Sequence, residues 1–334
     1  MSSRQTEFSV TNVCDTPKPL VSVLVVTYNQ EDTLGRTIDS LLAQDLEEPW
    51  EILICDDAST DGTARVARRY ADAHPDRIRL IVRDRNLGVQ GNYFDGVRRC
   101  RADLIADCAG DDFWCDPTKL RRQLELMREH PEVSLVHTGW SYLRPDGTTS
   151  LHTQAPEYSA PITPGRKILQ ALVSRERAVL IHLCTALYRK SPVIEALDRF
   201  PELMLNPSFL VEDLQIMAFE AAAGDIAYIP DDTLRYSVGH DSISTPKSMN
   251  KEFDFAFATF LLREALARHF SLPDRAMKPY RRTMLPFIAS RAFRGGSTER
   301  MSRLHMELHR LGLRAPLKTR LYSMLLKLKN LKSR

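Results

Sequence analysis

Two pairs of aspartates follow strand-like apolar runs within the first 115 residues of the chain. Asp56 and Asp57 come directly after the run Ile-Leu-Ile-Cys, and Asp111 and Asp112 come shortly after the run Leu-Ile-Ala-Asp. Adjacent carboxylates are costly to bury inside a sheet because both charges lose their hydration. They are tolerated at the carboxyl ends of strands, where open α/β sheets form their ligand crevice. Carboxylates at that edge are suited to hold a divalent cation and a polar ligand, so the pattern favours an enzyme.

The segments around these aspartates alternate between strand and helix patterns. Short β-branched runs predict buried strands, and helically spaced apolar residues between them predict helices. The expected strands are 21–26, 50–55, 78–82 and 102–108, and the helices begin near residues 34, 63, 92 and 117. This alternation is typical of an α/β fold with a mostly parallel sheet flanked by helices. No G-x-G-x-x-G and no G-x-x-x-x-G-K-[ST] motif follows the first strand, which disfavours a dinucleotide-binding domain.

The second half of the chain is less regular. Strands are expected at 134–142, 180–188 and 226–229, and Glu212-Asp213 opens an alanine-rich helix that ends at Gly224. From about residue 251 onward the pattern is helical throughout. We therefore expect a helical extension after the α/β region.

Composition limits the class of protein. With 334 residues, 43% hydrophobic and 27% charged, the chain is typical of a soluble protein with a core. It has no apolar run of about 18 residues that could span a membrane, and residues 1–18 lack the apolar region of a secretory signal. The six cysteines form no C-x-x-C pair, which favours reduced thiols in the cytoplasm over disulfides or a structural zinc site.

The net charge of +3 is unevenly distributed. Residues 311–334 contain seven lysines and arginines and no acid, so the rest of the chain is mildly acidic and gives no indication of nucleic-acid binding. The same segment has apolar residues on roughly one helical face, namely Leu317, Leu321, Met324, Leu325, Leu328 and Leu331. A basic amphipathic helix over residues 313–334 would suit an anionic membrane surface. Docking on the body of the protein or on a partner is an equal alternative.

The motifs occur in a specific order along the chain. They are Thr-Tyr-Asn ending at Asn29, Asp-Asp-Ala-Ser-Thr-Asp-Gly-Thr from Asp56, Asn-Leu-Gly from Asn86, Gly-Asp-Asp-Phe-Trp from Gly110, Glu212-Asp213, and Tyr236 followed by His240-Asp-Ser. Together they resemble the inverting glycosyltransferases of family 2, which share the GT-A fold, a Rossmann-like sheet flanked by helices. The resemblance covers residues 20–245. It leaves residues 1–19 as a flexible N-terminal arm and 246–334 as a helical C-terminal region.

The resemblance implies transfer of a sugar from a nucleotide diphosphate to an acceptor hydroxyl, with inversion at the anomeric carbon. The leaving diphosphate would need Mg²⁺ or Mn²⁺ beside it, and the acceptor hydroxyl would need a base. By resemblance Asp213 is that base, and Asp112 and His240 are metal ligands. Glu212 and His182 are expected to contact the acceptor. The residues assigned to the nucleotide and donor sugar are Thr27, Tyr28, Asn29, Asp56, Asp57, Asn86, Asn92, Asp111 and Arg235. Among them, Asp57 would contact the nucleobase and Asp111 the ribose or sugar, and the roles of Asp111 and Asp112 could be exchanged.

Several features leave alternatives open. Ala109 occupies a position where the family usually has an acid, so the metal site has fewer expected ligands. Asn92 lies where many relatives have an arginine. Either aspartate pair could instead cap the helix that follows it, and Glu212-Asp213 would be favoured at a helix start by the dipole alone. His240 and His182 could equally be structural residues.

These observations predict a cytoplasmic, metal-dependent hexosyltransferase that builds a surface polysaccharide, lipopolysaccharide or glycolipid. Because the chain has no Q-x-x-R-W segment, we expect the enzyme to be non-processive. Its expected donor is a nucleotide-diphosphate sugar, with a UDP-sugar as the first expectation, and its acceptor a saccharide or a lipid-linked saccharide. Attachment at the inner face of the plasma membrane would follow from the basic tail. The alternatives are a non-catalytic binding or scaffold protein on a degenerate transferase fold, and a sugar nucleotidyltransferase. The latter would show a glycine-rich phosphate loop after the first strand, where this chain has Thr-Tyr-Asn-Gln.

Overall fold

The structure is a computed structural model that describes residues 9–10, 17–152, 158–175, 181–239 and 248–332. The chain divides into two compact units. A sheet unit comprises residues 1–169, 177–205 and 211–239, and a helical unit comprises 170–176, 206–210 and 240–334. Each unit is described separately below.

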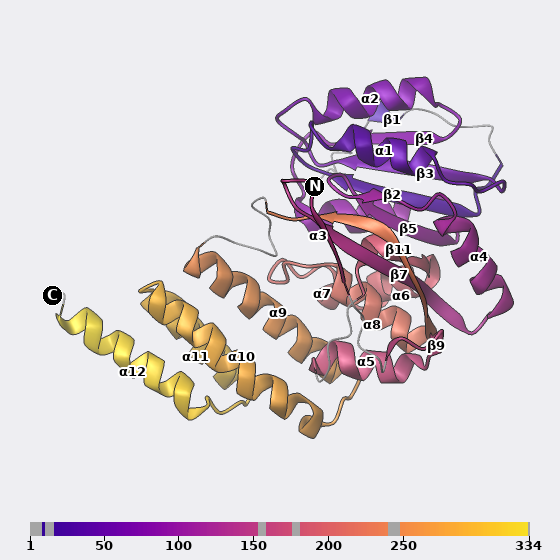
Figure 1. Cartoon of the computed structure of the whole chain (residues 1–334). Coiled ribbons are helices and arrows are strands. Elements are labelled where there is room, and N and C mark those ends of the chain that lie inside the picture. The colour runs from indigo at the N-terminus through magenta and orange to yellow at the C-terminus, as the bar shows by residue number, and fades with distance from the viewer. Residues whose placement is uncertain (1–8, 11–16, 153–157, 176–180, 240–247, 333–334) are drawn as a thin grey trace, which may run out of the picture. The chain divides into compact units, whose positions relative to one another are not determined.

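The sheet unit is built on one mixed sheet, which has eleven strands within the described residues (Figure 1). Its order is β1-β4-β3-β2-β5-β10-β7-β11-β6, with β8 paired to β7 and β9 to β11. The strands are β1 Ser9–Val10, β2 Val21–Thr27, β3 Trp50–Asp56, β4 Ile78–Val82, β5 Leu104–Ala109, β6 Phe113–Trp114, β7 Val133–Leu143, β8 Thr149–Leu151, β9 Ile162–Thr163, β10 Leu187–Arg189 and β11 Asp225–Ser237. Strands β2 to β5 are parallel, as expected, and β10 is antiparallel to both β5 and β7.

Helices of the sheet unit follow the strands in sequence. They are α1 Leu34–Leu42, α2 Thr63–Ala73, α3 Gly88–Arg99, α4 Lys119–Glu129, α6 Lys190–Arg199, α7 Pro201–Met204 and α8 Asp213–Ala223, together with the first half of α5 Gly165–Ser174, whose residues 170–174 belong to the helical unit. One face of the sheet forms the main core, where Val23 of β2 and Ile52 of β3 pack with Leu34 and Ile38 of α1. On α3, Gly96 allows close approach to the sheet, since a Cβ there would lie 2.7 Å from Leu24 Cδ1. The apolar runs of β2 and β3 are thus buried because helices cover the sheet.

Strand register places the ends of β2, β3 and β5 in one row. Thr27 pairs with Asp56, and Val26 pairs with Ala109. The side chains that follow these strands therefore emerge at the same edge. This alignment confirms the expected organisation of the first half of the chain.

Two strands differ from the sequence expectation. The predicted strand over 180–188 is replaced, within the described residues, by the 3₁₀ turn η2 Leu183–Thr185 and the short strand β10. The turn forms because Thr185 Oγ1 donates to the His182 carbonyl (2.6 Å) and Trp114 Nε1 donates to the Cys184 carbonyl (2.9 Å). Strand β11 is much longer than the predicted 226–229, because it continues past register irregularities near Asp232 to pair with the distal part of β7.

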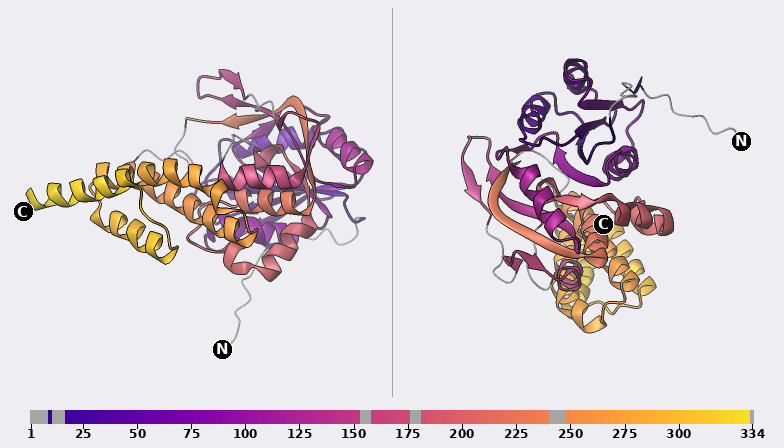
Figure 2. Two further views of the ribbon diagram at one scale, coloured as in Figure 1. Left: turned by 90° about the horizontal axis from the view of Figure 1, so that it is seen from below. Right: turned by 90° about the vertical axis from the view of Figure 1, so that its right-hand side faces the viewer.

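The helical unit contains α9 Met249–His269, α10 Asp274–Arg294, α11 Thr298–Arg310 and α12 Leu317–Lys332, which confirms the expected helical extension (Figures 1 and 2). Phe260 of α9 stacks on Tyr280 of α10 with ring centroids 5.9 Å apart. Arg281 forms a bidentate ion pair with the buried Glu264 (2.7 and 2.8 Å), which fixes α10 against α9. Across the described residues, the helices are all too short or too polar to cross a lipid bilayer.

Candidate active site

Loops following β2, β3 and β5 meet at the carboxyl edge of the sheet. The Asp57 N–H donates to the Thr27 carbonyl (3.0 Å), and the Gly110 N–H donates to the Val26 carbonyl (3.2 Å). Gly110 has no room for a side chain, because a Cβ there would lie 2.8 Å from Thr27 Oγ1 and 2.5 Å from Gln30 Oε1. The structure thus brings the first aspartate pair and the Gly-Asp-Asp loop to the same edge, as the sequence predicted.

Asp57 is a buried carboxylate that holds the start of α3. Its Oδ1 accepts from the Leu87 N–H (2.8 Å), and its Oδ2 accepts from the Gly88 N–H (3.0 Å). Burial raises the pKa of Asp57, while these two hydrogen bonds act in the opposite direction. The Asn86 side chain supports the loop by donating to the Asp57 carbonyl (3.2 Å). Asp57 therefore caps α3, and its contact with a nucleobase stays a prediction.

Asp56 and Asn29 shape the adjoining loop. Asp56 is fully buried and accepts from the Ser59 hydroxyl (2.5 Å), and burial raises its pKa. Asn29, in the left-handed region with φ 53°, accepts from the Thr60 N–H (2.8 Å) through Oδ1. Tyr28 remains 46% exposed beside them. Hydrogen bonds within the loop thus hold its conformation, and the exposed Tyr28 ring can contact a ligand.

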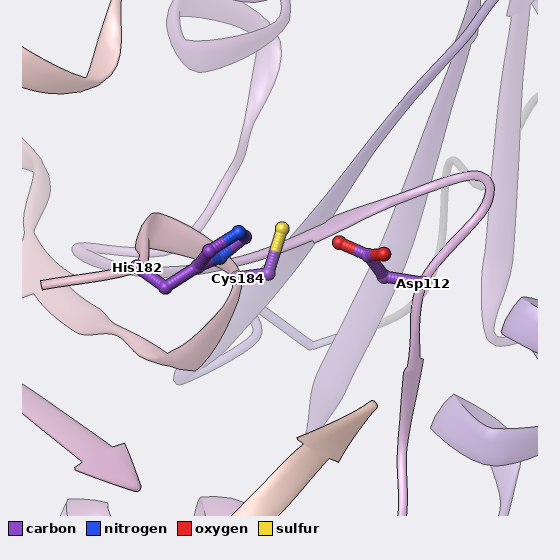
Figure 3. Close-up of side chains that lie close together, drawn as sticks. All are labelled: Asp112, His182 and Cys184. Carbon is purple, nitrogen blue, oxygen red and sulfur yellow. The ribbon is translucent and has the colours of Figure 1, made fainter. Parts of the chain in front are cut away.

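Asp112 forms a compact group with His182 and Cys184 (Figure 3). One ligand atom from each lies within 4.8 Å of the others, and this is the one such group of three His, Cys, Asp or Glu side chains in the described part of the chain. Asp112 Oδ1 also accepts from the Ser237 N–H (2.9 Å), and the Ala109 N–H donates to Cys184 Sγ (3.3 Å). The group connects the Gly-Asp-Asp loop to η2.

Burial governs the protonation of this group. Burial, and then the neighbouring Asp111, raise the pKa of Asp112 well above its ordinary value. Burial lowers the pKa of His182 to about 4, so its imidazole is neutral at pH 7, and its buried Nδ1 has no hydrogen-bond partner. A neutral imidazole is a suitable ligand for a divalent ion, and the Asp112 carboxyl group becomes one when it releases its proton on metal binding. The residues present therefore fit the metal expected from the sequence.

Two of the three residues of this group were not expected to be metal ligands. His182 was expected to contact the acceptor and Cys184 had no expected role in the site, yet both lie beside Asp112. Their His-x-Cys spacing was the available signal, but only the 3₁₀ turn brings both side chains to one side. His240, the other expected metal ligand, lies outside the described residues. Asp111 is half-buried, and its backbone carbonyl accepts from the Ser237 hydroxyl (2.6 Å).

An aromatic cluster surrounds His182 in the sheet unit. Trp140 of β7 stacks on His152 (4.6 Å between ring centroids) and lies 5.2 Å from His182, and His182 lies 4.4 Å from Tyr236 of β11. The fifth ring, Tyr142, packs edge-on against Trp140 at 4.6 Å. Trp140 Nε1 and His152 Nε2 are buried without hydrogen-bond partners. Aromatic faces with a few unpaired polar groups are typical of ligand sites, and the sequence reasoning missed Trp140, Tyr142 and His152.

Glu212 and Asp213 lie at the beginning of α8. Asp213 is the first helical residue, and its Oδ1 accepts from the Leu214 N–H (2.7 Å). Burial, and then the neighbouring Asp213, raise the pKa of Glu212 to about 8. The preceding Val211 carbonyl accepts from Gln90 Nε2 of α3 (2.9 Å), which attaches this loop to the helix that Asp57 caps. The role of Asp213 as a base stays a prediction.

Two further candidates are engaged in contacts within the sheet unit. Asn92 is buried, donates to the Cys55 carbonyl (2.9 Å) and accepts from Arg83 Nε (3.0 Å). The nitrogen and the oxygen of its amide are therefore both hydrogen-bonded within the protein, and these bonds are sufficient to explain why Asn92 is buried. Arg235 forms an ion pair with Asp232 (2.7 Å) on β11. Donor binding by either residue stays a prediction.

Comparison with solved structures identifies the fold. The fold resembles that of Staphylococcus aureus TarS in complex with UDP-GlcNAc (TM-score 0.55, 14% identity, covering 94% of this chain and 92% of that chain). It also resembles the mannosyltransferase PcManGT of Pyrobaculum calidifontis in complex with GDP-Man and Mn²⁺ (TM-score 0.53, 17% identity, covering 93% and 85%). These similarities confirm the GT-A fold.

Residues 22–197, more than half of the chain, match Glycosyl transferase family 2, and the chain belongs to that family. An uncharacterized protein of Mycobacterium tuberculosis is 32% identical over 213 residues, which are 63% of this chain and 56% of that protein. The Escherichia coli protein WfgD, a UDP-Glc:alpha-D-GlcNAc-diphosphoundecaprenol beta-1,3-glucosyltransferase, is 32% identical over 37% of this chain and 47% of its own length. The chain thus spans about half the length of these curated relatives.

Proposed function

We propose that this protein is a metal-dependent, inverting, non-processive glycosyltransferase. It transfers a hexose from a nucleotide-diphosphate donor to a hydroxyl of a saccharide or lipid-linked saccharide, on the cytoplasmic side of the membrane, in surface polysaccharide synthesis. The observation that carries the proposal is the group of Asp112, His182 and Cys184 at the sheet edge where Thr27 and Asp57 also lie. Support comes from family membership, from the nucleotide sugars bound by TarS and PcManGT, and from the lipid-diphosphate acceptor in the name of WfgD.

The metal site would act on the leaving group. Asp112 and His182 would hold the cation, which when bound stabilises the negative charge that develops on the departing diphosphate. Mn²⁺ suits this pair better than Mg²⁺ does, because imidazole is a ligand for transition metals whereas Mg²⁺ prefers oxygen. Cys184 contributes a thiol whose pKa is raised by burial, so it is a neutral neighbour before any metal binds.

The acid pair at the start of α8 would act on the acceptor. The acceptor oxygen forms a bond to the anomeric carbon as the bond from that carbon to the diphosphate oxygen breaks, and Asp213 receives the hydroxyl proton. Glu212, with its pKa raised to about 8, retains its own proton at pH 7 and can donate a hydrogen bond to an acceptor oxygen. One acid thus accepts a proton while its neighbour remains neutral, a division of roles common in enzymes that use paired carboxyl groups.

The rings around His182 would bind the sugar. Trp140 and Tyr236 provide apolar faces beside the metal ligands, and the buried Trp140 Nε1 and His152 Nε2, which have no hydrogen-bond partner, would pair with sugar hydroxyls when the rings move apart to admit the sugar. This arrangement would position the donor or acceptor ring next to the diphosphate.

A panel of UDP-sugars and GDP-mannose, each with Mn²⁺, tests the proposal. We expect one donor to raise the melting temperature and to be hydrolysed slowly in a Mn²⁺-dependent reaction. Asp213→Asn should reduce transfer by about 10²–10⁴-fold, the contribution of a positioned base, while leaving donor stabilisation nearly intact. Glu202→Gln, which makes the same carboxylate-to-amide change on the exposed surface of α7, is the matched control. An Asp213→Asn protein with normal turnover would refute the assignment, and a chain that binds no nucleotide sugar would be a scaffold instead.

A further inference from the structure

Helix α12 has two sides with opposite environments. On one side Thr319 and Leu326 are buried, and Tyr322 packs against Phe293 of α10 with ring centroids 5.6 Å apart. With about 3.6 residues per turn, these three positions fall on one face of the helix. This inner face attaches α12 to the rest of the helical unit, and Figure 2 shows the helix, in yellow, running beside its neighbours.

The opposite side carries an apolar stripe that is open to solvent. Its members are spaced at i, i+4, i+7, i+8 and i+11, and we call them the outer stripe: Leu317, Leu321, Met324, Leu325 and Leu328. Their exposed fractions run from 37% for Leu325 to 83% for Leu317. Soluble monomers rarely leave so many adjacent large apolar side chains exposed, and such patches mark interaction surfaces. The inner packing of α12 does not require these residues.

Basic residues flank the outer stripe on both sides. On the helical wheel Lys318 lies along one flank and Arg320 and Lys327 along the other, and all three are exposed. Residues 311–334 contain seven lysines and arginines and no acid. A second copy of α12 placed on the stripe would therefore bring cations against cations. An anionic lipid surface is complementary to both features, because leucines can enter the acyl region while the basic side chains reach the headgroups.

We propose that α12 lies in the plane of an anionic membrane surface and docks the protein there through the outer stripe. The inference does not depend on the proposed transferase activity, although a lipid-linked acceptor would be found at such a surface. Of the alternatives left by the sequence, the inner face supports docking on the rest of the helical unit, and the outer stripe supports contact with lipid.

Co-sedimentation of the full chain with vesicles tests the proposal. We expect binding to phosphatidylglycerol–phosphatidylcholine vesicles, little binding to pure phosphatidylcholine, and loss of binding as salt screens the charges. Leu321→Gln with Leu328→Gln should lower the partition coefficient about a hundredfold, taking about tenfold for each leucine removed from the lipid. Lys318→Gln with Lys327→Gln should lower it about tenfold or more, on the basis of about 1 kcal/mol per basic residue near an anionic surface.

Met306→Gln on α11 is the matched control, because Met306 is 62% exposed and lies outside the stripe. All variants should keep the wild-type melting temperature and the rate of donor hydrolysis in solution, since the altered side chains are exposed. The proposal is overturned if the wild-type chain does not sediment with anionic vesicles at low salt. It is equally overturned if Met306→Gln matches the stripe variant, or if light scattering shows a dimer that the stripe variant breaks while vesicle binding is unchanged.

Discussion

Glu212→Gln should stabilise the protein at neutral pH. Burial, and then the neighbouring Asp213, raise the pKa of Glu212 to about 8 from an ordinary value of 4.5. Between these two values the folded protein retains a proton that the unfolded chain releases, so the free energy of unfolding falls as pH rises. Glutamine has nearly the same shape and cannot ionise in either state. The substitution therefore removes this pH-dependent cost.

The size of the effect follows from the shift. At pH 7 the folded carboxyl is still protonated, whereas the unfolded carboxyl is ionised because pH 7 lies about 2.5 pH units above its pKa. At about 1.4 kcal/mol per unit, this difference gives a cost of about 3 kcal/mol. At pH 4 and below the carboxyl is mostly protonated in both states, and the cost becomes small. Glu212→Gln should therefore raise the free energy of unfolding by up to about 3 kcal/mol at pH 7 and by almost nothing at pH 4.

Urea denaturation of both proteins from pH 4 to pH 8.5 measures this difference directly. Glu202→Gln is the matched control, because it makes the same change at an exposed carboxyl on α7 and should follow the wild type at every pH. A Glu212→Gln protein whose stability differs from wild type by the same amount at all pH values would refute the reasoning. Such a result would mean that Glu212 is ionised in the folded protein at pH 7.

Asp57→Ala should lower the free energy of unfolding by about 1–2 kcal/mol, the usual value of a helix-capping side chain, because the N–H groups at the start of α3 lose their acceptor. Urea denaturation measures this, and an unchanged stability would contradict the capping role. Asp112→Asn keeps an acceptor for the Ser237 N–H but loses the carboxylate, so it should remove the Mn²⁺-induced rise in melting temperature; a full rise would exclude Asp112 as a ligand. Gly110→Ala should weaken donor binding at least tenfold by titration calorimetry, because its Cβ would displace Thr27 Oγ1 or Gln30. Wild-type affinity would show that this loop does not meet the donor.

Much of the sheet could be predicted because its signals are local. The runs in β2 and β3 are apolar on both faces, and an aspartate directly after such a run must lie at the strand end. Helix α2 begins at Thr63, where the sequence predicted it, since a turn ending in Gly62 and helical spacing define its start. Family membership and the GT-A fold followed from the order of the motifs.

The rest depended on contacts between distant segments. No local pattern indicates that Trp114 Nε1 binds the Cys184 carbonyl and so folds η2 in place of a strand. The grouping of His182 with Asp112, 70 residues earlier in the chain, has the same origin. Asp57 shows a similar limit, because the helix it caps begins about thirty residues later rather than immediately after it.

The first turn of α3 has a consequence for the order of events in a catalytic cycle. Asp57 is hydrogen-bonded to the backbone at the start of this helix, and Gln90 in the same turn holds the carbonyl of Val211 near the acid pair. A nucleotide that forms a hydrogen bond with Asp57 would therefore change the hydrogen bonds at the start of α3, and with them the position of the loop that carries Asp213. Thermodynamic linkage makes such coupling reciprocal, so acceptor affinity should depend on donor occupancy and donor affinity on the acceptor to the same degree.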